Sequence, residues 1–430
     1  MYRRTRVFSI VLFCTTTVAH VHAQSSENRL NELVQGALDR NREVLAVRQR
    51  LNEAQGLLRQ AGIRPNPTLE INAGTGRPLG TVGEEEYSAG YFRPVELGGK
   101  RDKRMLVAEV SVELAKAELD EKVRMLSFEI KTVAIEVLLA REKASALDLL
   151  IQLNADTYKL TEARVKEGDV APLDAQLLLV EQNRTEAQRA SLAGRLDGEL
   201  IDIRRLVGLA ISDPLALGDS IPTVNQLPSL ADLQALALKQ RPDLRSGRLV
   251  ANQGDAEVSL TNAQSTPDIT LSARYINRRS RFDDLYGQTR SGTLSLLRDQ
   301  DNIVMLGVSI PLFTGSRNQG NVDAAAARAL ATKLRMQHLE AAVPLEVEAA
   351  YRRFKAAQAT LAIFDRGVVG QSEKNLDIIR KAYGLGQLRL LDVLNEQRRL
   401  ADTQLSYIDA KADLARAANE LEKAIGGILP

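Results

Sequence analysis

The sequence contains little of what most enzymes and metal sites use. One cysteine, three histidines and no tryptophan occur in 430 residues, and aromatic side chains make up 4%. Cys14 lies in an N-terminal segment that we expect to be removed, together with two of the histidines, which leaves His338. A disulfide framework, thiol catalysis and a Cys/His metal cage are therefore excluded, and no phosphate-binding loop is present. We predict a protein that is not an enzyme and has no cofactor or metal site.

The N terminus has the parts of a secretory signal peptide. Three arginines precede an apolar run over residues 7–19, and a small-residue cleavage site ends at Ala23. A membrane anchor needs about 20 apolar residues, which is longer than this run. The residues before Cys14 do not form a lipoprotein signal. We predict a signal peptide over residues 1–23 and an exported mature chain.

The charge balance excludes nucleic acid as the partner. The chain has 57 basic and 55 acidic residues, and the signal peptide removes Arg3, Arg4 and Arg6, which leaves 54 basic against 55 acidic groups. A nucleic-acid-binding protein is normally strongly basic. The mature chain is close to neutral and rich in the residues that favour long helices.

The sequence repeats itself. Residues 94–100 (PVELGGK) recur in altered form at 311–317 (PLFTGSR), 217 positions downstream. We predict two similar halves, residues 24–217 and 229–430, joined by a proline-punctuated connector at 218–228. Other matched positions are Gly168 with Gly386, Asp174 with Asp392, Gly208 with Gly426, and 67–71 with 267–271.

Each half has the pattern helix, strand, loop, strand, very long helix, tight turn, long helix. Apolar residues recur at steps of three and four, as one face of a helix requires. No proline lies between Gly98 and Gly168, and Pro344 is the one proline in the matching segment of the second half. A nearly continuous helix of this length would span roughly 100 Å. We predict antiparallel helical hairpins with tips at 168–174 and 386–392. Ser229 and Asp232 predict a capping box that starts the second half.

Four segments predict strands, at about residues 67–76, 86–96, 267–277 and 302–313. Apolar and polar side chains alternate in them, and a length near ten residues matches that of outer-membrane barrel strands. Half of the mature tyrosines and phenylalanines lie in these regions, as expected for an interfacial belt. Four strands leave two unpaired edges, so we expect three copies to close a twelve-stranded barrel. The alternatives are a soluble sandwich or a soluble periplasmic coiled-coil scaffold.

These residues resemble the TolC-type outer-membrane factor family. Residues 61–67 (AGIRPNP) before the first strand and 96–101 (ELGGKR) after the second are similar to the branch that serves heavy-metal (cobalt-zinc-cadmium type) efflux. The resemblance implies a mainly α fold with a small transmembrane β part, and a homotrimer in outer-membrane lipid whose helices form a periplasmic tunnel. It implies a passive exit duct that docks onto a periplasmic adaptor (membrane fusion protein) and an inner-membrane RND pump. A duct for multidrug efflux or type I protein secretion remains an alternative.

The resemblance also assigns roles to the hairpin tips. It implies that the tips dock the adaptor, and that Asp392 contributes to an acidic gate, with Arg389 and Asp174 beside it. Capping of the returning helices is the alternative role of both aspartates. Family members carry a second acidic residue one turn after the first, where this chain has Asn395. The residues expected to dock the adaptor are Gly168, Asp169, Val170, Gly386, Gln387 and Leu388.

Overall fold

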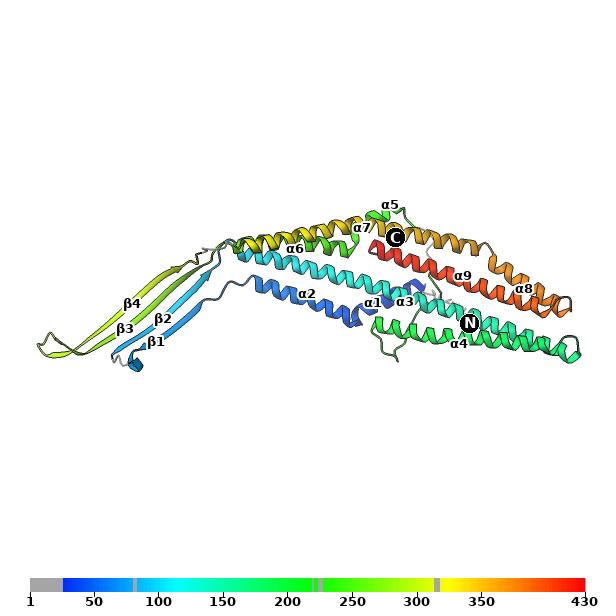
Figure 1. The fold of residues 1–430 in the computed structure, drawn as a ribbon, viewed down its shortest axis with the longest axis horizontal. Helices are drawn as coiled ribbons and strands as arrows, with labels where there is room; N and C mark the ends of the chain where they lie inside the picture. The colour runs from blue at the N-terminus through cyan, green and yellow to red at the C-terminus, as the bar shows by residue number, and fades with distance from the viewer. Residues whose placement is uncertain (1–25, 80–82, 219, 223–226, 313–317, 430) are drawn as a thin grey trace, which may run out of the picture.

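The computed structural model describes residues 26–79, 83–218, 220–222, 227–312 and 318–429 (Figure 1). The expected signal peptide at 1–23 lies outside the described residues, as does part of the connector. The molecule is elongated: the helices run side by side along most of its length, and the strands extend from one end (Figure 1). The prediction of a mainly α fold with a small β part is confirmed.

The two halves have the same order of elements. The first comprises α1 (Ser26–Arg40), α2 (Arg42–Ala61), β1 (Thr68–Thr75), the short 3-10 helix η1 (Arg77–Leu79), β2 (Glu84–Val95), α3 (Lys100–Glu167) and α4 (Pro172–Val207). The second comprises α5 (Leu230–Gln240), α6 (Pro242–Gln264), β3 (Ile269–Gln288), β4 (Leu294–Ser309), α7 (Gln319–Asp365), α8 (Val368–Gly384) and α9 (Leu390–Ile425). Among the described residues, none of the helices has both the length and the apolarity that crossing a membrane requires.

Helix α3 is continuous over 68 residues, because the chain has no glycine or proline between Lys100 and Glu167. At about 1.5 Å per residue it spans roughly 100 Å. Its turns bury alanine and leucine against α4, α6 and α9, so packing along the whole length stabilises it.

The corresponding helix of the second half is not continuous, which corrects the expectation. Pro344 lies inside α7, where Gln234 of α5 donates a hydrogen bond of 3.1 Å to its carbonyl oxygen. The break occurs instead at Gly367, whose φ of 105° is left-handed. The sequence pattern did not distinguish this glycine from others that helices tolerate.

The helix that opens each half is divided in two, which also corrects the expected single helix. In the first half, Asn41 caps α2 and its side-chain amide donates to the Leu206 carbonyl at 2.8 Å. In the second half, Arg241 precedes Pro242 and donates to the Ala424 carbonyl at 3.2 Å. In both halves the residue at the break therefore ties the short helices to the end of the returning helix. Of the expected capping box, the N-cap half forms, with Ser229 Oγ accepting from Asp232 N at 3.3 Å. The Asp232 carboxylate accepts from Ser229 Oγ at 2.6 Å, and the described contacts do not include a bond from it to the Ser229 backbone N–H.

The four strands form one antiparallel sheet in the order β1-β2-β3-β4. β3 and β4 are longer than the expected ranges 267–277 and 302–313, and they continue past β1 and β2 as a two-stranded ribbon (Figure 1). Residues 278–301, which lie beyond the expected ranges, lack the apolar alternation that predicted the strands, but backbone pairing does not require it. Residues 278–280 still pair with β2, so the two-stranded part begins at the pair Arg281 and Arg298. β4 ends at Ser309, before Pro311, which has no N–H for the ladder.

The core follows the helices and has separate parts. One cluster joins α5, α7 and α9, and a second joins α1, α3 and α4. A third lies between α3 and α9, where Ile221 of the connector is buried. A fourth, smaller cluster lies near the hairpin tips and includes Leu178, Tyr383 and Leu390. The two halves therefore share a core along α3 and α9.

Candidate functional site

The first hairpin tip is a tight turn built on glycine and proline. Gly168 ends α3 with a φ of 81°, and the next backbone N–H, of Asp169, donates to the Arg164 carbonyl at 2.9 Å. Pro172 then starts α4 at the position where its missing N–H has no cost. No side-chain cap holds this end of α4 among the described residues, so Asp174 lies in the first turn without capping it.

The second hairpin tip has the same kind of turn as the first, but its returning helix, α9, begins differently from α4. Gly386 has a φ of 74°, and Gln387 N donates to the Ala382 carbonyl at 2.9 Å. Here Asp392 Oδ2 accepts a hydrogen bond of 3.0 Å from Arg389 N. Asp392 therefore caps α9, whereas its repeat partner Asp174 does not cap α4.

A cluster of contacts joins the two tips within one chain. Arg164 of α3 donates to the Tyr383 carbonyl at 2.7 Å, and its guanidinium lies 4.9 Å from the centre of the Tyr383 ring. The Tyr383 hydroxyl is 2.8 Å from Thr161 Oγ1, and the ring is buried. Sequence reasoning missed all three residues. The sequence feature that could have pointed to them is Tyr383 itself, an isolated tyrosine three positions before Gly386 in helices that have few aromatic residues.

The tips carry the exposed side chains that a docking surface needs. Asp169, Gln387, Leu388 and Arg389 are exposed, and Val170 is partly buried. Four leucines of the two tips are also exposed beside these polar side chains: Leu173, Leu385, Leu388 and Leu391. Exposed apolar groups gathered in one place mark contact surfaces.

Above the tips, the interface between the hairpins is polar rather than apolar. Asn154, Thr157 and Thr161 of α3 are buried, as are Thr185 of α4 and Gln397 of α9. Gln397 donates to Thr157 Oγ1 at 3.1 Å, while neither polar atom of Asn154 has a hydrogen-bond partner in the described part of the chain. Buried polar groups without partners are costly, so the hairpins hold each other less firmly here than along their apolar part.

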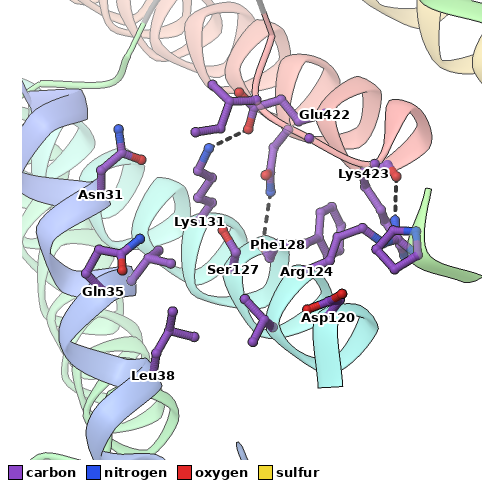
Figure 2. A pocket seen from close by; sticks show the side chains of 17 residues that line it. Asn31, Gln35, Leu38, Asp120, Arg124, Ser127, Phe128, Lys131, Glu422 and Lys423 are labelled. Atoms are coloured by element: carbon purple, nitrogen blue, oxygen red, sulfur yellow. Dashed lines mark hydrogen bonds and ion pairs between the residues drawn. The ribbon is translucent and has the colours of Figure 1, made fainter. Parts of the chain in front are cut away.

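A cavity of about 440 Å³ lies between α1, α3 and the end of α9 (Figure 2). Its charged side chains are already engaged: Lys131 pairs with Glu422, and Arg124 donates to the Lys423 carbonyl. Asn419 donates to the Phe128 carbonyl at 3.1 Å. Since these groups bind one another, the cavity does not define a ligand site. Across the described residues there is no cluster of three or more His, Cys, Asp or Glu side chains suited to a metal ion.

The strand register divides the sheet into two chemically different faces. Ile71, Tyr275 and Val304 lie in one cross-strand row, on a face that is apolar and exposed. The opposite face is the more polar one, although Ile276 and Ile303 also lie on it, and across it Arg274 forms an ion pair of 3.3 Å with Glu70. We call these the apolar face and the polar face. One side of this sheet suits lipid and the other suits water.

The combination of long hairpins with an amphipathic sheet at one end defines the class of outer-membrane channels with a helical tunnel. A family model described as "Outer membrane efflux protein" matches residues 33–209 and again residues 233–427. The chain belongs to this family, and the double match agrees with the two halves seen in the structure. It is an outer-membrane efflux channel, and its strand end lies in the outer membrane.

Individual relatives agree with this assignment. The chain is 24% identical over 393 residues to the cobalt-zinc-cadmium resistance protein CzcC of Cupriavidus metallidurans, covering 90% of this chain and 87% of that protein. It is 23% identical over 424 residues to the cation efflux system protein CusC of Escherichia coli K12, covering 93% and 87%. A crystal structure of CusC superposes with a TM-score of 0.75 at 18% identity, covering 93% of this chain and 92% of that chain.

A second solved structure shows the same fold. The outer membrane protein VceC of Vibrio cholerae superposes with a TM-score of 0.72 at 21% identity, covering 94% of this chain and 97% of that chain. The resemblance predicted from residues 61–67 and 96–101 is thus confirmed at the level of the family. The roles of the tip residues stay predictions.

Proposed function

We propose that three copies of this chain close the sheet into a twelve-stranded barrel, continuous with a tunnel formed by their helical hairpins. The open edges carry this proposal: within the part of the chain that the structure describes, β1 and β4 each pair on one side only. Unpaired backbone groups in lipid cost several kcal/mol each, as an order of magnitude, so a membrane sheet must close. Identical copies related by rotation join β4 of one chain to β1 of the next.

The tips are the surface that docks the periplasmic adaptor, which connects the duct to an inner-membrane RND pump. They lie at the end of the molecule opposite the strands (Figure 1). Support comes from the exposed leucines of both tips and from the tight left-handed turns at Gly168 and Gly386. These turns leave Asp169, Val170, Gln387 and Leu388 at the extreme end of each hairpin.

The gate lies at the second tip. Asp392 is exposed, and among the described residues its carboxylate accepts one hydrogen bond, at Oδ2 from Arg389 N. The carboxylate therefore caps α9 and still presents its negative charge at the tip. Arg389 is exposed three residues earlier. Asp174 has no capping role, so its carboxylate is also available at the first tip. Three chains would bring three copies of each group around one axis.

The cargo is a cation, in keeping with the names of the relatives CzcC and CusC. On the polar face toward the ribbon, Arg278 pairs with Glu86 at 2.9 Å, and three further carboxylates share that end of the face: Glu84, Asp299 and Asp301. In a closed barrel this face lines the water-filled interior, where negative charge concentrates cations.

A duct for organic compounds is the second candidate. The solvent efflux pump outer membrane protein SrpC of Pseudomonas putida is also 24% identical, over 426 residues, so identity does not separate the two cargo classes. The acidic polar face is the observation that favours cations.

The test uses the purified mature protein in detergent and in planar bilayers. A trimer mass and a reversal potential that reports cation preference in a salt gradient are expected. Replacing Glu84, Asp299 and Asp301 with their amides should weaken that preference. A monomer that stays soluble without detergent would contradict the barrel. If the ratio of cation to anion permeability is the same in the wild-type trimer and in the amide variant, the cation proposal alone is contradicted.

A further inference from the structure

The apolar face changes character toward the ribbon, row by row. Each cross-strand row lies about 7 Å beyond the previous one on the same face. The row of Ile71, Tyr275 and Val304 is followed by a row that contains Tyr87 and Asn302. Tyr275 Oη donates to Asn302 Oδ1 at 2.6 Å, which ties the two rows together. Tyrosines with a polar neighbour are typical of the boundary between lipid and water.

Beyond this boundary the same face becomes basic. The next row contains Arg279 opposite Gln300, and the row after it contains Arg281 directly opposite Arg298. We call Arg279, Arg281 and Arg298 the outer basic band. Glu85, which shares the row of Arg279, is already paired with Arg77 at 2.9 Å.

The charges are largely separated by face, with Glu85 and Arg278 as the exceptions. The rows that interleave with the outer basic band, on the polar face, hold the carboxylates Glu84, Glu86, Asp299 and Asp301 and the single guanidinium of Arg278. Arg278 and Arg279 are neighbours in the chain, but their side chains lie on opposite faces of the strand. Arg278 therefore lies among carboxylates, whereas Arg279 lies on the face of the other arginines. Exposure to water alone does not require basic and acidic side chains to lie on opposite faces of the strands.

Two of the three arginines of the outer basic band, Arg279 and Arg298, have no side-chain partner that balances their charge among the described residues. Both side chains are exposed, and neither forms an ion pair or hydrogen bond with another side chain of the described ranges. Exposed guanidinium groups such as these bind phosphate through paired hydrogen bonds.

The height of the band identifies the source of that anion. Nine to eleven residues are enough for a strand to cross the hydrocarbon layer, and β3 reaches Asn277 after nine residues, counted from Ile269. The band begins two residues later, on the side away from the periplasmic helices (Figure 1). It therefore lies at the head groups of the outer leaflet, facing lipid.

We propose that the outer basic band binds the phosphate groups of a phosphorylated glycolipid in the outer leaflet. This inference rests on the proposed barrel, which turns the apolar face toward lipid. The bound lipid seals the rim of the barrel against the surrounding membrane and holds the channel at a fixed height.

The test is native mass spectrometry of the full-length detergent-solubilised trimer with bisphosphorylated lipid A as the probe. An arginine near a membrane surface contributes roughly fivefold in affinity, so R279Q with R298Q should weaken binding by roughly 25-fold if the effects are additive. The matched control is R278Q, which removes the same charge from the neighbouring position on the polar face and should leave lipid A binding unchanged. Lipid A without phosphates should bind the wild type and the double variant equally.

Three results would overturn the proposal. The first is unchanged lipid A binding by a double variant that still forms trimers. The second is an equal loss in R278Q, which would show that general charge and not the face decides. The third is binding of inorganic pyrophosphate as tight as that of lipid A, which would make the ligand a free anion. A wild-type protein that shows no trimer mass refutes the barrel itself, so the two failures are distinguishable.

Discussion

Arg164 Nη1 donates a hydrogen bond of 2.7 Å to the carbonyl oxygen of Tyr383, and this contact ties one hairpin tip of the chain to the other. The Arg164 side chain is mostly buried there, beneath a tyrosine ring that is itself anchored to Thr161. The tips therefore move together as long as this contact holds, although the interface above them is polar and incompletely bonded.

Loss of this contact should loosen the tips. Arg164→Ala removes a hydrogen bond from a charged donor, which contributes about 1.5–3 kcal/mol, and we expect the open probability of single channels in planar bilayers to rise roughly 10- to 100-fold. Tyr383→Phe is the graded control, because it retains the ring and the carbonyl and loses the bond to Thr161 alone. Identical traces for Arg164→Ala and the wild type would show that the contact does not restrain opening.

The two roles of Asp392 can be separated by a pair of variants. Asp392→Asn retains a side-chain oxygen that can accept from Arg389 N but removes the charge, whereas Asp392→Ala removes both. A gate predicts higher conductance in both variants. If the conductance rises in Asp392→Ala alone, the residue acts as a helix cap, whose loss costs about 1 kcal/mol.

Adaptor docking should depend on the leucine at the second tip. We expect Leu388→Glu to abolish efflux-dependent resistance while trimers still reach the outer membrane, because a charge replaces apolar contact area. The conservative exchange Leu388→Met should retain resistance. Normal resistance in Leu388→Glu would rule out a docking role for this side chain, and missing trimers would show an assembly defect instead.

The pair Arg241–Asp243 should make stability depend on acid. Burial alone would raise the pKa of Asp243, but the hydrogen bond and positive charge of Arg241 outweigh burial and hold this pKa below its ordinary value of 3.8. The pair therefore stabilises the fold above the pKa of the unfolded chain, and this stability is lost as the pH falls through the lower folded pKa. The thermal midpoint of helix unfolding, followed by circular dichroism, should decrease over this range. Asp243→Asn should lower the midpoint at pH 7 and flatten its acid dependence; an unchanged acid profile would contradict this assignment.

Much of the helical architecture could be predicted from local signals. The run without glycine or proline after Lys100 becomes one helix, because nothing in it disfavours helical backbone. Gly168 and Gly386 end their helices in left-handed turns, and Ser229 caps its helix as its spacing with Asp232 predicts. Alternation likewise located all four strands, although not the full length of the ribbon.

The helix breaks could not be predicted, because they depend on neighbours in space. Pro344 is retained within α7 beside Gln234, while the break falls at Gly367, a residue with the same local propensity as glycines inside other helices. The division at Asn41 similarly depends on the carbonyl of Leu206, which is 165 residues away.

The sequence by itself determined the two halves, the long hairpins, their glycine tips and the amphipathic strands, because repeat spacing and periodicity act through near neighbours along the chain. The tertiary structure decided which side chains meet: Tyr383 against Arg164 at the tips, Asp392 as a cap where Asp174 is not, and Arg281 opposite Arg298 in the ribbon. Those pairings depend on register between segments far apart in sequence, and a shift of one residue would place each side chain on the other face.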